Sequence, residues 1–216
     1  MYASSLLVQA LLATAAFAVP TQPPRIARRL GARRLGRETL AAESTTTTGP
    51  VINASPGTWK TVIGTFTVPA ASQLTSATSA SAWVGIDGDT CTSAILQVGV
   101  DFTVSGSSVT YDGWYEWYPD YAYSVSGIGF SAGDSVTLNV TATSKTAGVA
   151  TITNASKGVS VSKKITSTAA LCEQDAEWQV EVFSSGGVVV PSPPVVFTKE
   201  EAITNNGTII IPSGSA

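Results

Sequence analysis

Carboxyl and amide side chains alternate with apolar residues in three stretches of this 216-residue chain. The stretches are AILQVGVDF at 94–102, TYDGWYEWY at 110–118 and AEWQVEVF at 176–183. Successive side chains of a β-strand point to opposite faces, so each stretch would present its polar groups on one face. The groups that share a face are Ile95, Gln97, Gly99 and Asp101 in the first stretch, Asp112, Trp114, Glu116 and Tyr118 in the second, and Glu177, Gln179, Glu181 and Phe183 in the third.

The chemistry open to these faces is limited because the chain contains no histidine. Without imidazole there is no Ser-His-Asp or Cys-His catalysis and no His-ligated zinc site, so acid–base work falls to carboxylates, Tyr or Lys. Polar groups are costly to bury unless something needs them. If the three faces come together, they form an aromatic-walled groove floored with carboxylates and amides, which would suit acid–base catalysis or sugar binding.

The elements that would position these groups are short strands. The composition is 44% hydrophobic and 12% charged, with 19 Gly and 11 Pro, which favours one all-β domain over a helical or disordered chain. The clearest alternation is at 135–143, and similar runs occur at 61–69, 81–86 and 148–156. No segment repeats apolar residues at helical spacing over three turns, so the pattern predicts a β-sandwich or barrel.

The first 18 residues are expected to be a secretory signal peptide. An apolar run from Leu6 to Ala18 ends in Ala16-Phe17-Ala18, a small-x-small cleavage signal, and it is too short to span a bilayer. We therefore expect a secreted, extracellular protein with no membrane anchor.

A basic segment and a Ser/Thr linker are assigned to residues 19–50. All six Arg lie between Arg25 and Arg37, so that residues 19–43 carry a net charge of +4 and residues 44–216 a net charge of −7. This split indicates a zymogen whose basic pro-segment pairs with, and inhibits, the acidic domain at residues 51–216 until acid protonates the carboxylates. A basic amphipathic helix or a nucleic-acid-binding tail is the alternative, and export disfavours nucleic acid.

The two cysteines, Cys91 and Cys172, are expected to form a disulfide in an exported protein. Closing so long a loop would stabilise the fold by about 4–5 kcal/mol on the chain-entropy estimate. Four sequons agree with a secretory route and offer glycosylation candidates, which are Asn53, Asn139, Asn154 and Asn206.

Five longer strings resemble the fungal glutamic peptidases, the eqolisin family. They are SAWVGIDGDTC, AILQVGVDF, YDGWYEWYPDYAY, SAGDSVTLNVTATS and ALCEQDAEWQVEVF, and the similarity runs from about Thr61 to Phe183. The resemblance implies an acid-acting endopeptidase, insensitive to pepstatin-type inhibitors, on a concanavalin-A-like, lectin-like β-sandwich of two antiparallel sheets. It places the catalytic pair on Gln97 and on Glu181, rather than Glu177.

The resemblance also implies supporting roles. Asp87, Asp101 and Glu116 match acids that orient the pair, Trp83 matches an aromatic wall, and Asp112 matches a further acid. We expect a monomer that acts on a peptide or protein substrate, with no cofactor, no metal and no nucleic acid. Large aromatics usually bury, so the side chains expected in the core are Tyr115, Trp117 and Trp178.

The sequence departs from the family pattern at both ends of the domain. The string that normally opens the mature domain is absent around Trp59, and the segment after Phe183 is compressed, so the terminal strands are expected to be missing or short. One alternative is therefore an inactive relative that serves as a secreted binding protein. Another is a β-sandwich glycoside hydrolase using Glu116 and Glu181, whose carboxyl groups would then stand about 5–9.5 Å apart.

Overall fold

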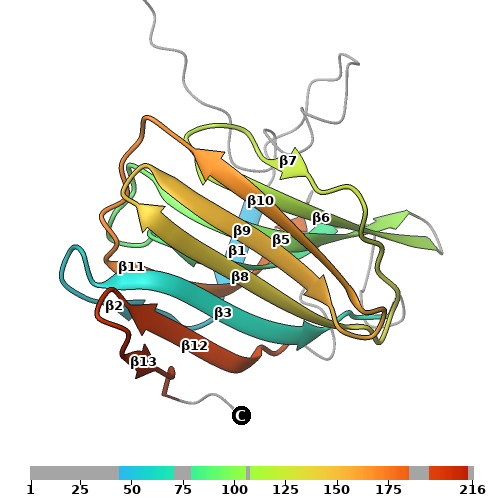
Figure 1. The fold of residues 1–216 in the computed structure, drawn as a ribbon. Helices are drawn as coiled ribbons and strands as arrows, with labels where there is room; N and C mark the ends of the chain where they lie inside the picture. The colour runs from blue at the N-terminus through green and yellow to red at the C-terminus, as the bar shows by residue number, and fades with distance from the viewer. Residues whose placement is uncertain (1–43, 71–78, 106–107, 185–194, 214–216) are drawn as a thin grey trace, which may run out of the picture.

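A computed structural model describes residues 44–70, 79–105, 108–184 and 195–213, which form two antiparallel β-sheets packed face to face (Figure 1). The expected signal peptide at 1–18 and the basic segment at 19–43 lie outside the described residues. Within the described ranges, no helix has the length and apolar character needed to cross a membrane. The all-β sandwich predicted from the sequence is confirmed.

The seven-stranded sheet contains all three stretches that carry the candidate catalytic groups. Its strand order is β1-β11-β4-β5-β6-β7, and β2 also pairs with β11. The strands are β1 (Ser44–Thr48), β2 (Val51–Asn53), β4 (Ser79–Ile86), β5 (Ile95–Ser105), β6 (Ser108–Tyr118), β7 (Tyr123–Ser124) and β11 (Asp175–Ser184).

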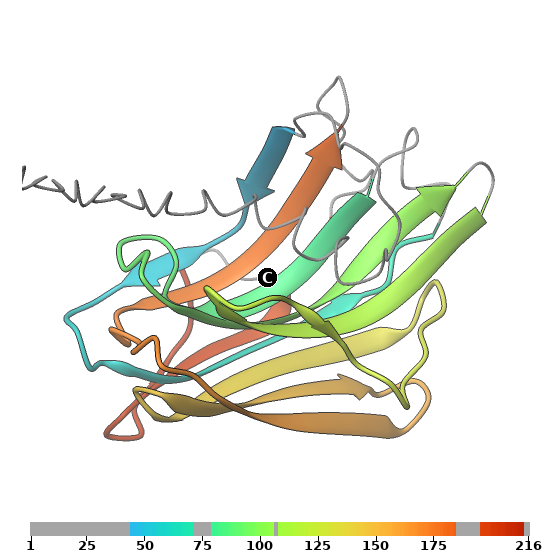
Figure 2. The ribbon, with the colours of Figure 1, turned by 90° about the horizontal axis from the view of Figure 1, so that it is seen from above.

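The six-stranded sheet lies against the first one, as the view in Figure 2 shows. Its order is β10-β9-β8-β3-β12-β13, so the last described strands complete one edge of it. The strands are β3 (Trp59–Thr67), β8 (Ser135–Ser144), β9 (Ala147–Asn154), β10 (Val159–Thr166), β12 (Thr198–Thr204) and β13 (Ile209–Ile210).

The hydrophobic core fills the space between the sheets. Phe66 from β3 meets Phe102 from β5 edge to face, with ring centroids 6.0 Å apart. Trp178 from β11 is fully buried, and its indole Nε1 donates to the carbonyl of Ile63 at 2.6 Å, which joins the two sheets. Trp117 and Trp178 lie in this core, and Tyr115 packs against it. The core assignment is confirmed for Trp117 and Trp178, whereas Tyr115 is only partly buried.

Two parts of the strand pattern differ from the sequence-based expectation. Residues 44–48, expected to be a linker, form β1 and pair with β11 from Ser44↔Ser184 to Thr48↔Val180. Threonine is β-branched and suits an edge strand, so a composition typical of linkers also fits a strand once a partner is available. The compressed C-terminal segment still provides the seven-residue β12 and the short β13.

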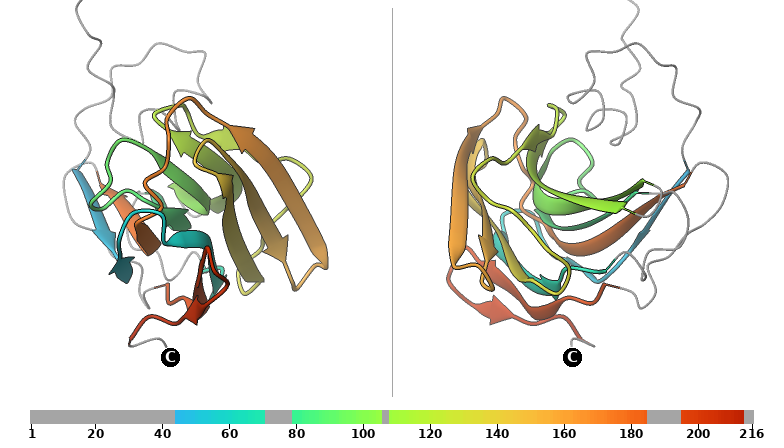
Figure 3. Two further views of the ribbon diagram at one scale, coloured as in Figure 1. Left: turned by 60° about the vertical axis from the view of Figure 1, so that its left-hand side comes forward. Right: turned by 90° about the vertical axis from the view of Figure 1, so that its right-hand side faces the viewer.

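The outer face of the seven-stranded sheet is concave. Alternate residues of β4, β5, β6 and β11 point either into the core or to this outer face, and Figure 3 shows the sheet curving away from its six-stranded partner. Curvature of this kind turns the side chains on the concave side toward one another. The fold therefore gathers polar residues from four strands on one surface.

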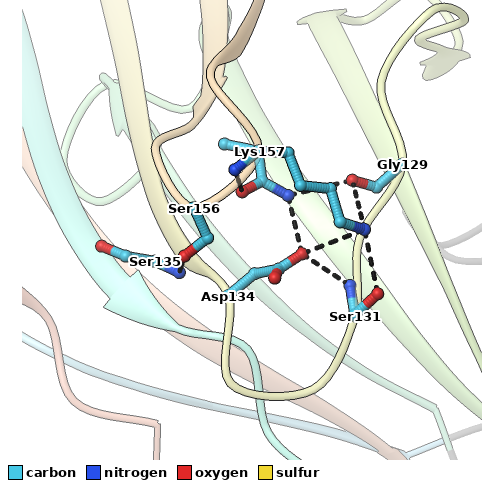
Figure 4. Close-up of polar contacts among 7 residues, drawn as sticks. Gly129, Ser131, Asp134, Ser135, Ser156 and Lys157 are labelled. Atoms are coloured by element: carbon cyan, nitrogen blue, oxygen red, sulfur yellow. Dashed lines mark hydrogen bonds and ion pairs between the residues drawn. The ribbon is translucent and has the colours of Figure 1, made fainter.

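Asn154, a predicted glycosylation site, is fully buried at the end of β9. Its Nδ2 donates to the carbonyl of Gly129 at 2.9 Å and to Asp134 Oδ2 at 2.7 Å. Figure 4 shows the same carboxylate accepting from Ser131 N and pairing with Lys157 Nζ at 3.2 Å. The prediction for Asn154 disagrees with the folded structure, because the nitrogen that would carry the glycan has no access to solvent. Asn53, Asn139 and Asn206 stay predictions.

Candidate active site

Strand register arranges the polar outer face of the seven-stranded sheet in three rows. Each row runs across β11, β4, β5 and β6, because residues paired in register lie side by side. The first row is Glu177, Gly85, Gln97 and Glu116; the second is Gln179, Trp83, Gly99 and Trp114; the third is Glu181, Ser81, Asp101 and Asp112.

Gln97 and Glu116, both predicted site residues, are in direct contact in the first row. Both side chains are 0% exposed, and Gln97 Nε2 donates to Glu116 Oε2 at 2.9 Å. The other polar atom of the amide, Gln97 Oε1, is buried and receives no hydrogen bond from the described residues. A buried carbonyl oxygen without a donor is uncommon in folded proteins, which makes this amide a candidate functional group.

Trp83 and Trp114 form the middle row, and glycines make room for them. Trp83 is fully buried beside Trp114 and Ala122. A Cβ at Gly99 would lie only 2.4 Å from the ring of Trp114, so this position requires glycine. The indole Nε1 of Trp114 donates to Ser81 Oγ at 3.2 Å, which fixes the ring over the sheet. The expected aromatic wall is thus part of the floor of the concave face.

Glu181, the other predicted catalytic residue, lies in the third row and is 3% exposed. It pairs in register with Ser81 on one side and with Thr47 of β1 on the other. The structure places it on the same concave face as Gln97 without direct contact, because the Trp83 row lies between them. A reacting group bound over Trp83 would have Gln97 on one side and Glu181 on the other.

Asp101 and Asp112 are directly opposite each other on β5 and β6. Both are partly exposed and belong to the row of Glu181, two residues along each strand from the row of Trp83. Like charges at directly opposed positions of neighbouring strands repel each other. Asp101 and Asp112 thus form a partly exposed pair, whereas Glu116 and Asp87 are buried.

Asp87, also named as a supporting acid, binds backbone rather than the catalytic pair. Its Oδ2 accepts from the N–H groups of Cys172 and Glu173 at 2.8 and 2.9 Å, and its Oδ1 from those of Gln174 and Asp175 at 2.8 and 3.3 Å. Burial raises the pKa of Asp87, while these backbone hydrogen bonds act in the opposite direction. Asp87 thus fixes the segment that leads into β11, the strand of Glu181.

Asp175 in turn binds the backbone of the segment that follows Asp87, and the sequence analysis did not predict this contact. Its Oδ2 accepts from the backbone N–H groups of Thr90 and Cys91 at 2.8 and 2.9 Å. The predicted disulfide between Cys91 and Cys172 is confirmed and joins the same two segments. The two cysteines were the feature of the sequence that indicated contact between these segments. Asp87 lies near both sulfur atoms, but they are bonded to each other and offer no thiolate to a metal.

Charge is divided between the two sheets. Ten of the thirteen acids in the described residues lie on the seven-stranded sheet or on the turns at its ends. All six Lys lie on the six-stranded sheet or its turns, at positions 60, 145, 157, 163, 164 and 199. The concave face is therefore acidic, and no described cation belongs to its sheet.

Comparison with known proteins agrees with this arrangement. Residues 45–216 match the family described as the Peptidase A4 family. The chain belongs to the peptidase A4 family. It is 40% identical to aspergillopepsin-2 of Aspergillus niger over 254 aligned positions, covering 97% of this chain and 89% of that protein. It is 46% identical to scytalidopepsin B of Scytalidium lignicola, covering 68% of this chain and 59% of that protein.

Solved structures of family members have the same fold. A scytalido-glutamic peptidase with a transition state analog inhibitor has a TM-score of 0.68 and 36% identity, covering 79% of this chain and 85% of that chain. The aspergilloglutamic peptidase of Aspergillus niger has a TM-score of 0.56 and 48% identity, covering 64% and 84%. The resemblance to glutamic peptidases is confirmed, and this family membership supports a peptidase.

Proposed function

We propose that this A4-family protein is a secreted, acid-acting endopeptidase in which Glu181 activates water and Gln97 stabilises the oxyanion. The observation that carries the proposal is the burial of both side chains on one concave face, on either side of Trp83. Similar solved peptidases have been captured with a peptide-based transition state analog and with the tripeptide Ala-Ile-His, which supports a peptide substrate over this face.

The proposed reaction is hydrolysis of a peptide bond. Ionised Glu181 takes a proton from a water molecule while the water oxygen bonds to the scissile carbonyl carbon. Gln97 Nε2 has one hydrogen on Glu116, and its second hydrogen is donated to the oxygen that becomes negative. Glu181 then returns the proton to the leaving nitrogen as the carbon–nitrogen bond breaks. A well-placed oxyanion donor contributes about 10²–10³ in rate.

The basic pro-segment is proposed to inhibit the enzyme before secretion is complete. The acidic concave sheet gives it a complementary surface at neutral pH, and protonation of those carboxylates would release it. A synthetic peptide of residues 19–43 should inhibit the mature enzyme near pH 6 and lose this effect near pH 3. Equal inhibition at both pH values would contradict a charge-based mechanism.

The test of the catalytic assignment is Glu181→Gln, which keeps the shape of the side chain and removes the base. Digestion of a denatured protein at pH 3 should fall by about 10³-fold or more, while the melting temperature stays close to that of the parent. Glu201→Gln on the six-stranded sheet is the matched control and should retain full activity. Glu177→Gln should retain measurable activity, which separates the two acids of β11.

Parent-like cleavage by Glu181→Gln would overturn the assignment. A parent protein that folds, sheds its pro-segment and cleaves nothing would instead favour the inactive binding protein.

A further inference from the structure

A second pocket lies between β6 and β7 of one sheet and the end of β10 of the other. Its volume is about 390 Å³, and its lining includes Tyr115 and Trp117 of β6 and the three hydroxyl residues at 166–168. Successive residues of a strand point to opposite sides, so Tyr115 and Trp117 face away from the concave surface that holds Trp114 and Glu116. The pocket is therefore separate from the candidate active site.

Stacked tyrosines form one wall of this pocket. Tyr123 of β7 pairs in register with Tyr115, and the two rings stack with centroids 5.7 Å apart and an interplanar angle of 25°. The indole Nε1 of Trp117 donates to the carbonyl of Ala169 at 2.9 Å, which fixes the neighbouring ring. Tyr123 rests on Tyr115 and is still 44% exposed, so part of its ring is available to a ligand. An exposed aromatic ring at a pocket gives a flat apolar platform with a polar tip.

Polar groups surround the platform. Asp120 Oδ1 accepts from the backbone N–H of Tyr121 at 2.8 Å, and Asp120 Oδ2 accepts from the Tyr123 hydroxyl at 3.0 Å. Each carboxylate oxygen can accept a further hydrogen bond. Ser167 Oγ accepts from the backbone N–H of Ala169 at 3.1 Å and keeps its own proton to donate, and the exposed residues on either side of Ser167 also carry hydroxyl groups. The pocket thus combines an apolar ring with strong acceptors and with groups that both donate and accept.

We propose that this pocket binds a pyranose sugar, and β-linked glucose in particular. A pyranose whose hydroxyl groups are all equatorial has C–H bonds on both faces, which stack on an aromatic ring. Its hydroxyl groups lie at the edge of the ring, where each can donate to a carboxylate or exchange hydrogen bonds with a protein hydroxyl. A cation such as choline would use the rings and Asp120 but would leave the hydroxyl groups at 166–168 without a role. The volume is ordinary for a small-molecule site, and the inference does not depend on the proposed peptidase function.

Calorimetric titration of the full chain with cellotriose, a trimer of β-linked glucose, tests the proposal. We expect one site with a dissociation constant of about 1 mM or below. Tyr123→Ala removes the exposed ring and should weaken binding by about tenfold or more, whereas Tyr123→Phe keeps the ring and should stay within about threefold of the parent. Tyr121→Ala is the matched control and should bind like the parent, because Tyr121 is 53% exposed close by and does not line the pocket.

Two further arms separate the possible sources of the sugar and its location. The titration is run before and after treatment with an enzyme that removes N-glycans. Binding that appears only after the treatment would support the site and identify the protein's own glycan as its occupant. Glu181→Gln, changed on the concave face, should bind cellotriose as the parent does whether or not the parent cleaves peptides.

Three results would overturn the proposal. The first is the absence of cellotriose binding both before and after glycan removal. The second is an equal loss of affinity in Tyr121→Ala and Tyr123→Ala, or a loss in Glu181→Gln, since either would place the sugar elsewhere. The third is tighter binding of choline than of cellotriose, which would make the pocket a cation site.

Discussion

Asp87 and Glu116 are two fully buried carboxyl groups of one sheet, and their surroundings differ in kind. Four backbone N–H groups fill both oxygens of Asp87, and Asp175 makes the reciprocal contact beside the disulfide. Glu116 instead holds a side-chain amide whose carbonyl oxygen has no donor among the described residues. A buried polar network in which every donor and acceptor is hydrogen-bonded stabilises the fold. A network that leaves an acceptor without a donor is more typical of a functional site.

The contacts of Asp87 and those of Glu116 also affect different parts of the candidate active site. The lock formed by Asp87, Asp175 and the Cys91–Cys172 disulfide fixes the entry into β11, which begins at Asp175, before Glu181 in the same strand. The Gln97–Glu116 pair sets the direction of one N–H group. Changes in the lock should therefore alter stability first, and changes in the pair should alter kcat first.

The largest expected effect is on the lock. Asp87→Ala removes the acceptor of four backbone donors, each of which costs about 1–3 kcal/mol when left unsatisfied in a buried site. Partial hydration reduces this sum, and we expect a loss of about 4–6 kcal/mol in the free energy of unfolding, measured by denaturant titration. Asp89→Ala is the control, because Asp89 lies exposed on the same turn and is bonded to Asn53. Equal losses of stability in the two variants would show that the backbone hydrogen bonds of Asp87 contribute no more to stability than the exposed Asp89 does.

The next effect is on the pair. Gln97→Leu keeps the approximate volume of the side chain and removes the amide, so kcat should fall by about 10²–10³, with a melting temperature near that of the parent. Steady-state kinetics on a peptide substrate at pH 3 would measure it. A variant that loses stability but keeps kcat would place Gln97 with the structural residues and remove the contrast with Asp87.

A change at Gly99, in the row of Trp83 between the two candidate catalytic groups, should have a smaller effect. Gly99→Ala places a methyl group 2.4 Å from the ring of Trp114 and 2.7 Å from Trp83 Cβ, so the rings must move. Overpacking of this kind costs about 1–3 kcal/mol, which thermal unfolding would detect. Gly129→Ala, where a Cβ meets open space, is the control and should be close to neutral. Two equally stable variants would mean that the tryptophans adapt without strain.

The smallest effect concerns an acid away from both regions. The hydrogen bond from Asn154, aided by Lys157, lowers the pKa of Asp134. Because the pKa of Asp134 is lower in the folded state, its ionised carboxylate stabilises the fold at pH values above its pKa in the unfolded state. This stabilisation is lost as the pH falls through its pKa in the folded state. Asp134→Asn should therefore lower the melting temperature slightly at pH 7 and have less effect near pH 2. A larger effect in acid would contradict the direction of the shift.

Much of the fold follows from alternation along the chain. The runs at 61–69, 81–86, 94–102, 110–118, 135–143, 148–156 and 176–183 correspond to strands, and the tryptophans on their apolar faces lie in the core. β10 (VSVSKKIT) was missed because Lys163 interrupts the alternation of Val159, Val161 and Ile165, and none of its side chains is fully buried. Asn154 was misjudged because a sequon carries no information about burial.

Only part of the candidate site could be predicted from alternation along the chain. Alternation assigns Gln97, Glu116 and Glu181 to the faces they occupy, since period 2 depends on the strand alone. The same pattern could not separate Asp87 from Glu116, because both are acids near aromatics, one directly after β4 and the other within β6. Ser81 was overlooked, although it alternates with Trp83 and supports Trp114.

The sequence by itself determined most of the strands, the two faces of those strands, the absence of histidine chemistry and the family to which the chain belongs. Only the tertiary structure decided which acid meets which partner. Hydrogen-bond partners come from strand register and from turns that join segments more than eighty residues apart, as in the contact of Asp87 with Cys172. Burial and register are properties of the packed sheets, and they separate Asp87, which accepts from backbone N–H groups, from Glu116, which accepts from the side-chain amide of Gln97.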